Sequence, residues 1–519
     1  AVCKPTQGLA TADNARFVRL WFEVNLKKVG FGCSSAEEAL ETKRKWFPYN
    51  KGGASRKWYG NQDYLINWEY DGIGVKNNVG AVIRNPEQYF KVSISWSKVS
   101  STKIAFRYFP KGFIFADAGM SIFSEAKLFY LHGYCNSNVA SSFIEILSPT
   151  LNYEVGHIGA LPINIIENSI NVEKIVKDNI FISKQDWDSH ETSWDFDENP
   201  LLSYINKEIV EGETGKSYKI ESLYNLYTTD WEERFMQLHA NEEELNRQFI
   251  EIYGLQDELT PDVPLDEVTI LQQGEIKVDD NRIEFQPDVV VKQFISYAVG
   301  CMMGRYRLDK PGLHIAHPNP TDDEVCIYSY NGRNFTIDDD AIIPLMARDT
   351  VFTDNAGERF REFLKVALGE DTLTENLNFI EGALGKDIDT YFVKDFWKDH
   401  LSRYQRRPIY WLFASKKGAF QCITYMHRMN PYTVEQIRNK YLLPHIEYLG
   451  TRIAEMESRA ATLSTKERKD MTKLQKDLEE CREYHDRLHL IADKQIDFDL
   501  DDGVVVNYAK FEDVVVKLK

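Results

Sequence analysis

The chain has 519 residues, of which 43% are hydrophobic and 13% aromatic, and its formal net charge is -18 at pH 7. This composition excludes a disordered chain, and the length predicts two to four domains rather than one hydrophobic core. The negative charge argues against indiscriminate binding to nucleic acid but leaves local basic patches open. Because no apolar run could span a membrane and no signal peptide is recognisable, we expect a cytoplasmic protein without membrane contact.

The seven cysteines are an odd number, widely scattered and without a C-x-x-C pair: Cys3, Cys33, Cys135, Cys301, Cys326, Cys422 and Cys481. This pattern predicts reduced thiols, with neither a disulfide framework nor a zinc site. The chain opens on "AVCKPTQGLATADN" without a methionine, which indicates a segment cut from a longer protein. We therefore expect residues 1–18 to be a linker.

Residues 19–165 are rich in Trp, Tyr and Phe. Short alternating runs such as "YFKVSISWSKV" and "KGFIFADAG" lie between glycine turns and predict the strands of a first mixed-sheet lobe. The following "LFYLHGYCNSNVASSFIEILSPT" predicts one helix that ends at Ser148-Pro149. Residues 166–285 are acidic and predict a mainly helical connector.

Residues 286–430 return to a mixed pattern and predict a second α/β lobe. Within it, "VVVKQFISYAVGCMMGRYRLDKPG" predicts a helix broken by its glycines. The segment "YFVKDFWKDHLSRYQRRPIYWLFAS" predicts a buried strand at its end.

Residues 431–519 predict an antiparallel helical hairpin and a C-terminal tail. Apolar residues recur at alternating steps of three and four in two runs: Ile446, Leu449, Ile453, Met456, Ala460 and Leu463, then Met471, Leu474, Leu478, Cys481, His485 and Leu488. Two capping boxes are expected, Ser464 with Glu467 and Thr433 with Gln436. The simplest interpretation of the hairpin is a structural one, as a spacer arm or a packing element. The chain as a whole is predicted to be a multidomain α+β protein with mixed-sheet lobes.

Motifs for methyl transfer to adenine are absent from the sequence. Such enzymes need an F-x-G-x-G loop for S-adenosylmethionine and an N-P-P-Y loop that holds the flipped base. "VGFGCSS" has a single G-x-G and suits a turn, and Asn430-Pro431-Tyr432 lacks the second proline and precedes a capped helix. We therefore predict no catalytic residue, no cofactor site and no metal site in this chain.

A nuclease remains an alternative. Pro261-Asp262 followed by Glu275 and Lys277 matches a P-D…E-x-K pattern, in which two carboxylates hold Mg²⁺ and the lysine stabilises charge at the phosphate. The pattern is loose, and in a chain with 80 acidic residues it arises easily by chance.

The stretch "KWFPYNKGGASRKWYGN", residues 45–61, concentrates cations, aromatics and glycines. No acid occurs from 43 to 57 or from 91 to 111. Cations and hydroxyls suit phosphates, amides suit base edges, and glycines permit close approach. We predict DNA contacts at Lys45, Lys51, Arg56, Lys57, Tyr59, Asn61, Gln62, Lys98, Ser101, Lys103 and Arg107. The alternative is that the aromatics, the tryptophans above all, are core and the cations a solvated face.

Several long segments carry a resemblance to a known family, among them "QGLATADNARFVRLW", "KWFPYNKGGASRKWYGN", "INWEYDG", "SPTLNYEVGHIGALPI", "SYAVGCMMGRYRLDKPG", "RRPIYWLFASKKGAFQCITYMHR" and "DFDLDDGVVVNYAKF". In order, and over nearly the whole chain, they resemble the C-terminal portion of the PglX family, the adenine-specific (N6) DNA methyltransferases of BREX phage-defence systems. The family's catalytic and cofactor motifs have no counterpart here.

The resemblance implies a DNA target-recognition region with a helical spacer. It implies that an upstream methyltransferase domain of the longer parent binds S-adenosylmethionine and transfers the methyl group, while this chain binds no cofactor. Duplex DNA, that upstream domain and other BREX proteins are the implied partners. Whether the chain is itself an enzyme stays open. The alternatives are a Mg²⁺-dependent nuclease of a restriction system and a protein-interaction scaffold of a defence complex.

Overall fold

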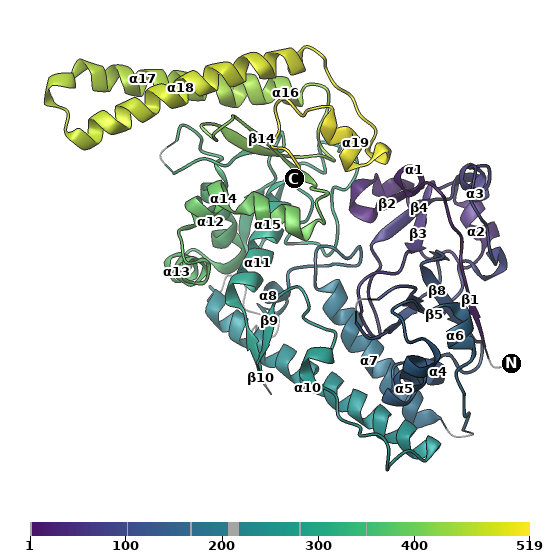
Figure 1. Ribbon diagram of the computed structural model, residues 1–519. Helices are drawn as coiled ribbons and strands as arrows, with labels where there is room; N and C mark the ends of the chain where they lie inside the picture. Colours follow the sequence, from purple (N-terminus) through teal and green to yellow (C-terminus); the bar gives the residue numbers. More distant parts are fainter. Residues whose placement is uncertain are drawn as a thin grey trace. The chain divides into compact units, whose positions relative to one another are not determined.

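The computed structural model describes residues 3–100, 102–166, 169–205, 217–279, 282–348 and 350–518 (Figure 1). Its contacts divide the chain into two compact units. The first unit comprises Ala1–Trp21, Leu26–Phe196 and Leu226–Gln286, and the second comprises Phe22–Asn25, Asp197–Asn225 and Pro287–Lys519. Both contain helices and small sheets, so the predicted α+β class is confirmed.

The strands of the first unit form two four-stranded sheets and a hairpin. The first sheet has the order β1 (Lys4–Thr6), β8 (Gly119–Phe123), β5 (Ser93–Ser97), β6 (Phe106–Phe109), all antiparallel. The second has the order β2 (Val18–Leu20), β4 (Tyr64–Asn67), β3 (Trp46–Asn50), β7 (Ile114–Phe115), with β3 and β7 parallel. The hairpin pairs β9 (Ile276–Asp279) with β10 (Arg282–Phe285). The strands predicted at 89–99 and 111–119 are confirmed.

The helices of the first unit are α1 (Asn14–Phe17), α2 (Ala36–Glu41), α3 (Glu69–Lys76), α4 (Leu128–Cys135), α5 (Asn138–Leu147), α6 (Val155–Gly159) and α7 (Ile170–Asp188), with most of α10 (Ile220–Tyr253). The prediction of one helix up to Ser148 was wrong, because α4 ends at Cys135 and α5 begins at Asn138. The Ser137 hydroxyl caps α5 by accepting from the Ala140 amide at 3.3 Å. The Asn136 side chain makes two bonds to the Phe106 backbone. Its oxygen accepts from the Phe106 amide at 2.9 Å, and its nitrogen donates to the Phe106 carbonyl at 2.9 Å.

The second unit has two small sheets. β11 (Ile327–Tyr330) pairs with β12 (Arg333–Thr336), and β15 (Gln421–Tyr425) lies between β13 (Ile342–Pro344) and β14 (Tyr410–Ala414). Its helices are α8 (Pro200–Ser203), α11 (Pro287–Met302), α12 (Ala356–Leu368), α13 (Leu373–Leu384), α14 (Ile388–Lys394), α15 (Phe396–Arg403), α16 (Thr433–Gln436), α17 (Leu443–Ser458), α18 (Thr465–Ala492) and α19 (Val504–Ala509). The strand predicted to follow "SRYQRRPI" is the buried β14, so that prediction is confirmed.

The helical hairpin is present as α17 and α18 (Figure 1). Its seam buries Leu449, Ile453 and Met456 of α17. The Ser464–Glu467 capping box is confirmed, with the Ser464 amide donating to Glu467 at 2.8 Å and the Glu467 amide donating back to the Ser464 hydroxyl at 3.2 Å.

The prediction of a second capping box, Thr433 with Gln436, was wrong. The residue that caps α16 is Tyr432, and its side chain makes no capping bond. The Thr433 hydroxyl instead accepts from the Asn430 amide at 3.0 Å, and the Asn430 side chain accepts from the Tyr432 amide at 2.9 Å. Asn430-Pro431-Tyr432 is therefore a helix-entry turn, as the sequence predicted.

The cysteines are all free thiols. Among the helices in the described ranges, none combines the length and the apolarity that a membrane span requires.

Candidate nucleic-acid interface

The basic and aromatic stretch, residues 45–61, forms the whole of β3 and most of the loop, residues 51–63, that leads to β4 within the first unit. The loop crosses from its own sheet to the edge strand β6 of the other. The Trp58 amide donates to the Phe106 carbonyl at 2.9 Å, and the Tyr108 amide donates to the Trp58 carbonyl at 2.8 Å. Gly52 and Gly53 have φ values of 78° and 138°, which glycine adopts without strain. The loop is thus tied to both sheets by its backbone.

Arg107 and Asn61, predicted to touch DNA, brace this loop from inside. Arg107 is 0% exposed and donates to the carbonyls of Ala54 at 3.2 Å and Arg56 at 3.4 Å, and to the Ser97 hydroxyl at 2.9 Å. Burial lowers the pKa of Arg107 to about 10, so it remains charged at neutral pH. The Asn61 amide also donates to the Ala54 carbonyl, at 2.8 Å. The structure therefore assigns both side chains to holding the loop rather than to its outer surface.

Arg56 is likewise held inside the first unit. Its guanidinium forms an ion pair with Asp186 of α7, and the two side chains are 7% and 0% exposed. Its Nε donates to the Tyr59 carbonyl at 3.0 Å. The second oxygen of Asp186 accepts from the Leu271 amide at 2.9 Å. A buried charge is stable only when it is paired in this way, so Arg56 fastens the loop to α7.

The other predicted side chains have mixed environments. Three cations lie in ion pairs: Lys57 with Glu242 at 2.6 Å, Lys98 with Glu154 at 2.9 Å and Lys103 with Glu267 at 2.6 Å. Tyr59 and Gln62 are each 2% exposed, and the Tyr59 hydroxyl donates to Gln62 at 3.2 Å. Ser101 lies outside the described residues. Lys45 and Lys51 are half-buried, so they stay predictions as phosphate contacts.

The two basic segments of the sequence do come together. The Ser55 hydroxyl donates to the Lys103 carbonyl at 3.0 Å, and a cleft of about 720 Å³ opens beside them. Ala54, Ser55, Lys57, Thr102 and Lys103 line one side of the cleft, and residues 265–272 with the start of the β9 strand line the other. Because Glu267 pairs with Lys103 across this cleft, its charge is largely balanced, and it is not by itself a phosphate site.

A more exposed group of cations lies at the other end of β3. The Lys45 amide donates to the Lys28 carbonyl at 3.0 Å, and the Gly30 amide donates to the Trp46 carbonyl at 2.8 Å, so two chain segments run side by side. They gather a basic patch consisting of Arg19, Lys27, Lys28, Lys43, Arg44 and Lys45. Lys43 and Arg44 are exposed, and neither forms an ion pair with the described residues.

Sequence reasoning found half of this basic patch. Lys43, Arg44 and Lys45 stand out as an acid-free run, whereas Arg19, Lys27 and Lys28 are distant in sequence and lie among other residue types. Two members of the patch lie against the buried Trp46, whose ring is 5.8 Å from the Arg19 guanidinium carbon and 5.4 Å from Lys45 Nζ. Only the packing of the segments brings them together.

Glu275, one of the two carboxylates in the nuclease alternative, is buried and bound by protein groups. Glu275 is 0% exposed, and one of its oxygens lies 2.7 Å from His190 Nε2 while the other accepts from the Gln273 amide at 2.8 Å. Burial depresses the pKa of His190, but the Glu275 carboxylate outweighs it and leaves that pKa raised. Asp262 and Lys277 are exposed, whereas Glu275 is engaged inside the first unit. These contacts give Glu275 a role within the fold and do not favour it as a Mg²⁺ ligand.

Within the described ranges, Asp338, Asp339 and Asp340 are three acids whose oxygens lie close enough together to share an ion. Asp340, however, forms an ion pair with Lys440 at 2.9 Å and accepts from the Tyr441 hydroxyl at 3.2 Å. Burial, followed by the charge of Asp340, raises the pKa of Asp338 to about 7. These contacts explain the acids as anchors for the segment that precedes α17.

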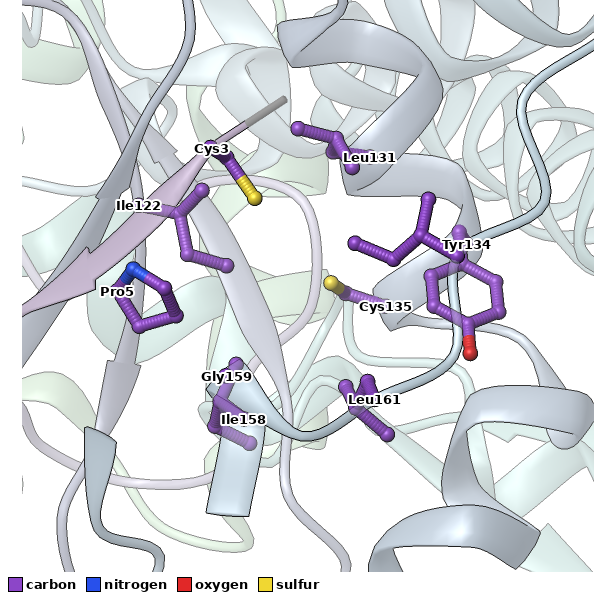
Figure 2. A pocket seen from close by; sticks show the side chains of 10 residues that line it. Cys3, Pro5, Ile122, Leu131, Tyr134, Cys135, Ile158, Gly159 and Leu161 are labelled. Atoms are coloured by element: carbon purple, nitrogen blue, oxygen red, sulfur yellow. The ribbon is translucent and has the colours of Figure 1, made fainter. Parts of the chain in front are cut away.

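An apolar pocket of about 200 Å³ also lies in the first unit (Figure 2). The thiols of Cys3 and Cys135 point into it beside Ile122, Leu131 and Leu161. Burial raises the pKa of both thiols, so neither is the thiolate that nucleophilic or metal chemistry needs. The pocket is also smaller than typical small-molecule sites. It carries no catalytic role.

His132 packs against Trp58 of the loop, and its lowered pKa predicts that the first unit loses stability as the pH falls. Its Nε2 lies 2.9 Å from the Phe106 carbonyl, its ring centroid lies 5.1 Å from that of Trp58, and burial lowers its pKa to about 4. Between pH 6.5 and 4 the unfolded chain therefore binds a proton that the folded unit refuses. The stabilisation is complete above the unfolded pKa and falls with decreasing pH, by about 1.4 kcal/mol per pH unit.

We expect His132→Gln, whose amide can still donate to Phe106, to remove this share of the pH dependence. The measurement is urea unfolding followed by tryptophan fluorescence across this pH range, since eight of the ten tryptophans lie in the first unit. His489→Gln, at an exposed residue of α18, is the control and should keep the wild-type slope. An equal slope in wild type and His132→Gln would contradict the assignment.

The comparisons with known proteins agree with the resemblance seen in the sequence. No family model matches the chain. It is 38% identical over 529 residues to the adenine-specific methyltransferase PglX of Lacticaseibacillus casei (strain Zhang), and 35% identical over 532 residues to the adenine-specific methyltransferase BrxX of Escherichia coli O9:H4 (strain HS). Each match covers 97% of this chain and 42% of the relative. The chain is thus similar along almost its whole length to the adenine-specific methyltransferases PglX and BrxX, and spans about two fifths of theirs.

Proposed function

We propose that this chain is the DNA target-recognition region of a BREX-type adenine-specific methyltransferase. It would hold duplex DNA so that an upstream catalytic domain of the parent protein, with S-adenosylmethionine bound, can methylate adenine at N6. The observation that carries the proposal is the match over 97% of the chain to two adenine-specific methyltransferases, together with the absence of methyl-transfer motifs from the sequence. A part of a DNA methyltransferase that lacks the catalytic motifs is well suited to bind the DNA substrate instead.

The basic patch is the part of the first unit best suited to phosphates. Lys27, Lys43 and Arg44 of the patch are exposed cations in a chain that is acidic as a whole, so the patch offers a local attraction to DNA phosphates. Arg44 adds a planar guanidinium that can hold a phosphate with two donors. By contrast Arg56, Asn61 and Arg107 are occupied inside the loop, so the proposal does not rest on them.

We expect the triple variant Lys43→Gln/Arg44→Gln/Lys45→Gln to bind every duplex more weakly than wild type. Phosphate contacts are independent of sequence, and each one lost should reduce the slope of log affinity against log salt by about 0.9, hence by about 2–3 units in all. The measurement is fluorescence anisotropy with duplexes of different sequence at a series of salt concentrations. The protein needs low salt to bind, since its net charge is -18.

A matched control removes three exposed lysines elsewhere in the first unit, Lys4, Lys91 and Lys174. It changes the net charge by the same amount without touching the basic patch, and should keep most of the wild-type slope. If both variants lost the same slope, general electrostatics would replace the basic patch as the explanation. If the wild-type chain bound no duplex at low salt, the proposed function itself would be overturned.

A further inference from the structure

A row of four lysines runs along the outer face of the hairpin. Lys466, Lys469, Lys473 and Lys476 follow one another at steps of three, four and three in α18, which places them on one face of the helix. All four are exposed. The side of α18 that carries Leu474, half-buried at this level of the hairpin, faces away from the row. We call this row the lysine stripe.

The lysine stripe lies in a basic part of an acidic chain. From Arg459 to Lys476 there are six cations and two acids, against a net charge of -18 for the whole chain. None of the four stripe lysines forms an ion pair within the described residues. Of the two acids, Glu467 is bound by the Ser464 amide in the capping box, and Asp470 is exposed. The positive charge of the lysine stripe is therefore directed at solvent.

The fold of the hairpin does not require these lysines. The half of α18 that carries them lies beside α17, with the Gln475 amide donating to Glu457 at 3.3 Å. The later half is held by residues around the β14 strand, with Glu480 accepting from the Ser415 hydroxyl at 2.6 Å and the Tyr484 hydroxyl donating to the Val514 carbonyl at 2.6 Å. In Figure 1 the turn between α17 and α18 is the free end of the hairpin. Like charges three and four residues apart cost a helix about 0.2–0.5 kcal/mol per pair. The repulsion within the stripe therefore slightly destabilises α18, and an anionic partner would relieve it.

We infer that the lysine stripe binds the phosphate backbone of duplex nucleic acid without reading its bases. This inference rests on the proposed function only in its choice of DNA over another polyanion. From Lys466 to Lys476 the helix rises about 15 Å, a length over which one strand of a duplex presents about four phosphates. Lysines contact phosphate as flexible point charges, so the stripe supplies affinity and orientation but no sequence preference. The hairpin is then a phosphate-binding arm as well as a spacer.

The test is the full chain with all four stripe lysines changed to glutamine, titrated with a duplex of arbitrary sequence at a series of salt concentrations. The slope of log affinity against log salt should decrease by about 3–4 units. Circular dichroism should show unchanged helix content, because the residues are exposed and glutamine is nearly as good a helix former as lysine. The control changes four exposed lysines elsewhere in the second unit, Lys394, Lys398, Lys416 and Lys494, and should leave the slope close to wild type.

The variants of the stripe and of the basic patch separate the two proposals. A wild-type slope in the stripe variant, with a reduced slope in the Lys43/Arg44/Lys45 variant, would overturn the inference and leave the proposed function standing. A reduced slope in the stripe variant alone would support the stripe and overturn the basic patch. A stripe variant that keeps its duplex affinity but loses salt-sensitive binding to polyglutamate would assign the stripe to an acidic protein surface instead. A wild-type chain that binds no duplex would overturn both.

Discussion

Replacing Asp186 by alanine is expected to destabilise the first unit by about 3–5 kcal/mol, because it leaves a buried charge without its partner. Arg56 and Asp186 are 7% and 0% exposed, so water cannot replace the carboxylate. The same substitution removes the acceptor of the Leu271 amide, 2.9 Å away. Urea unfolding followed by tryptophan fluorescence measures the loss, since most tryptophans lie in this unit.

Two further variants give this result its meaning. Asp178→Ala removes the same charge from an exposed position of the same helix, α7, and should change stability by less than about 0.5 kcal/mol. The double variant Arg56→Met/Asp186→Leu removes both charges and should recover much of the loss, since a buried ion pair can often be replaced by apolar side chains. Stability within about 0.5 kcal/mol of wild type in Asp186→Ala would contradict the buried pair.

The double variant also tests the predicted DNA contact at Arg56. If it is folded and keeps the wild-type salt slope, Arg56 acts only within the fold. If it is folded and its slope decreases by about one unit, Arg56 reaches a phosphate after all, and the ion pair must open on binding.

Trp58→Ala is the second large effect, with an expected loss of about 3–5 kcal/mol from the first unit. Trp58 is 1% exposed, and its Nε1 donates to Glu242 at 2.6 Å, so truncation leaves both a cavity and a buried carboxylate short of one donor. Trp58→Phe should cost less, about 1.5–3 kcal/mol, because it keeps most of the packing and loses the bond to a charged acceptor. The measurement is again urea unfolding.

Phe181→Ala is the control for Trp58, because it removes an aromatic ring that is 61% exposed on α7. It should be close to neutral. The opposite outcome would be a Trp58→Ala protein of wild-type stability that no longer binds duplex DNA. That result would make Trp58 a stacking residue and would restore the aromatic half of the predicted interface.

Features that depend on neighbours in sequence were predictable. The helical hairpin and the Ser464–Glu467 capping box are both present, because each depends on residues close together in sequence. The first helix ends at Ser458, so Ala460 and Leu463 of the predicted apolar run lie outside α17. The break between α4 and α5 was missed, although Ser137 is a good cap, because the reason for the break is the distant Phe106 backbone that holds Asn136. Similarly, Thr433 had the right spacing for a cap, but its hydroxyl was taken by Asn430.

The sequence by itself determined the α+β class, the hairpin, the free thiols and the likeness to adenine-specific methyltransferases, because each is written in composition, local periodicity or aligned residues. The environments of the cations in the two basic segments were decided by tertiary structure alone. Arg56, Lys57 and Arg107 look alike as cations in a sequence, yet one pairs with Asp186 and one with Glu242, and the third braces a loop. Arg56 and Lys57 are paired with residues 130 and 185 positions away, and Arg107 binds backbone carbonyls 51 and 53 positions away. Lys43 and Arg44 are exposed and form no ion pair within the described residues.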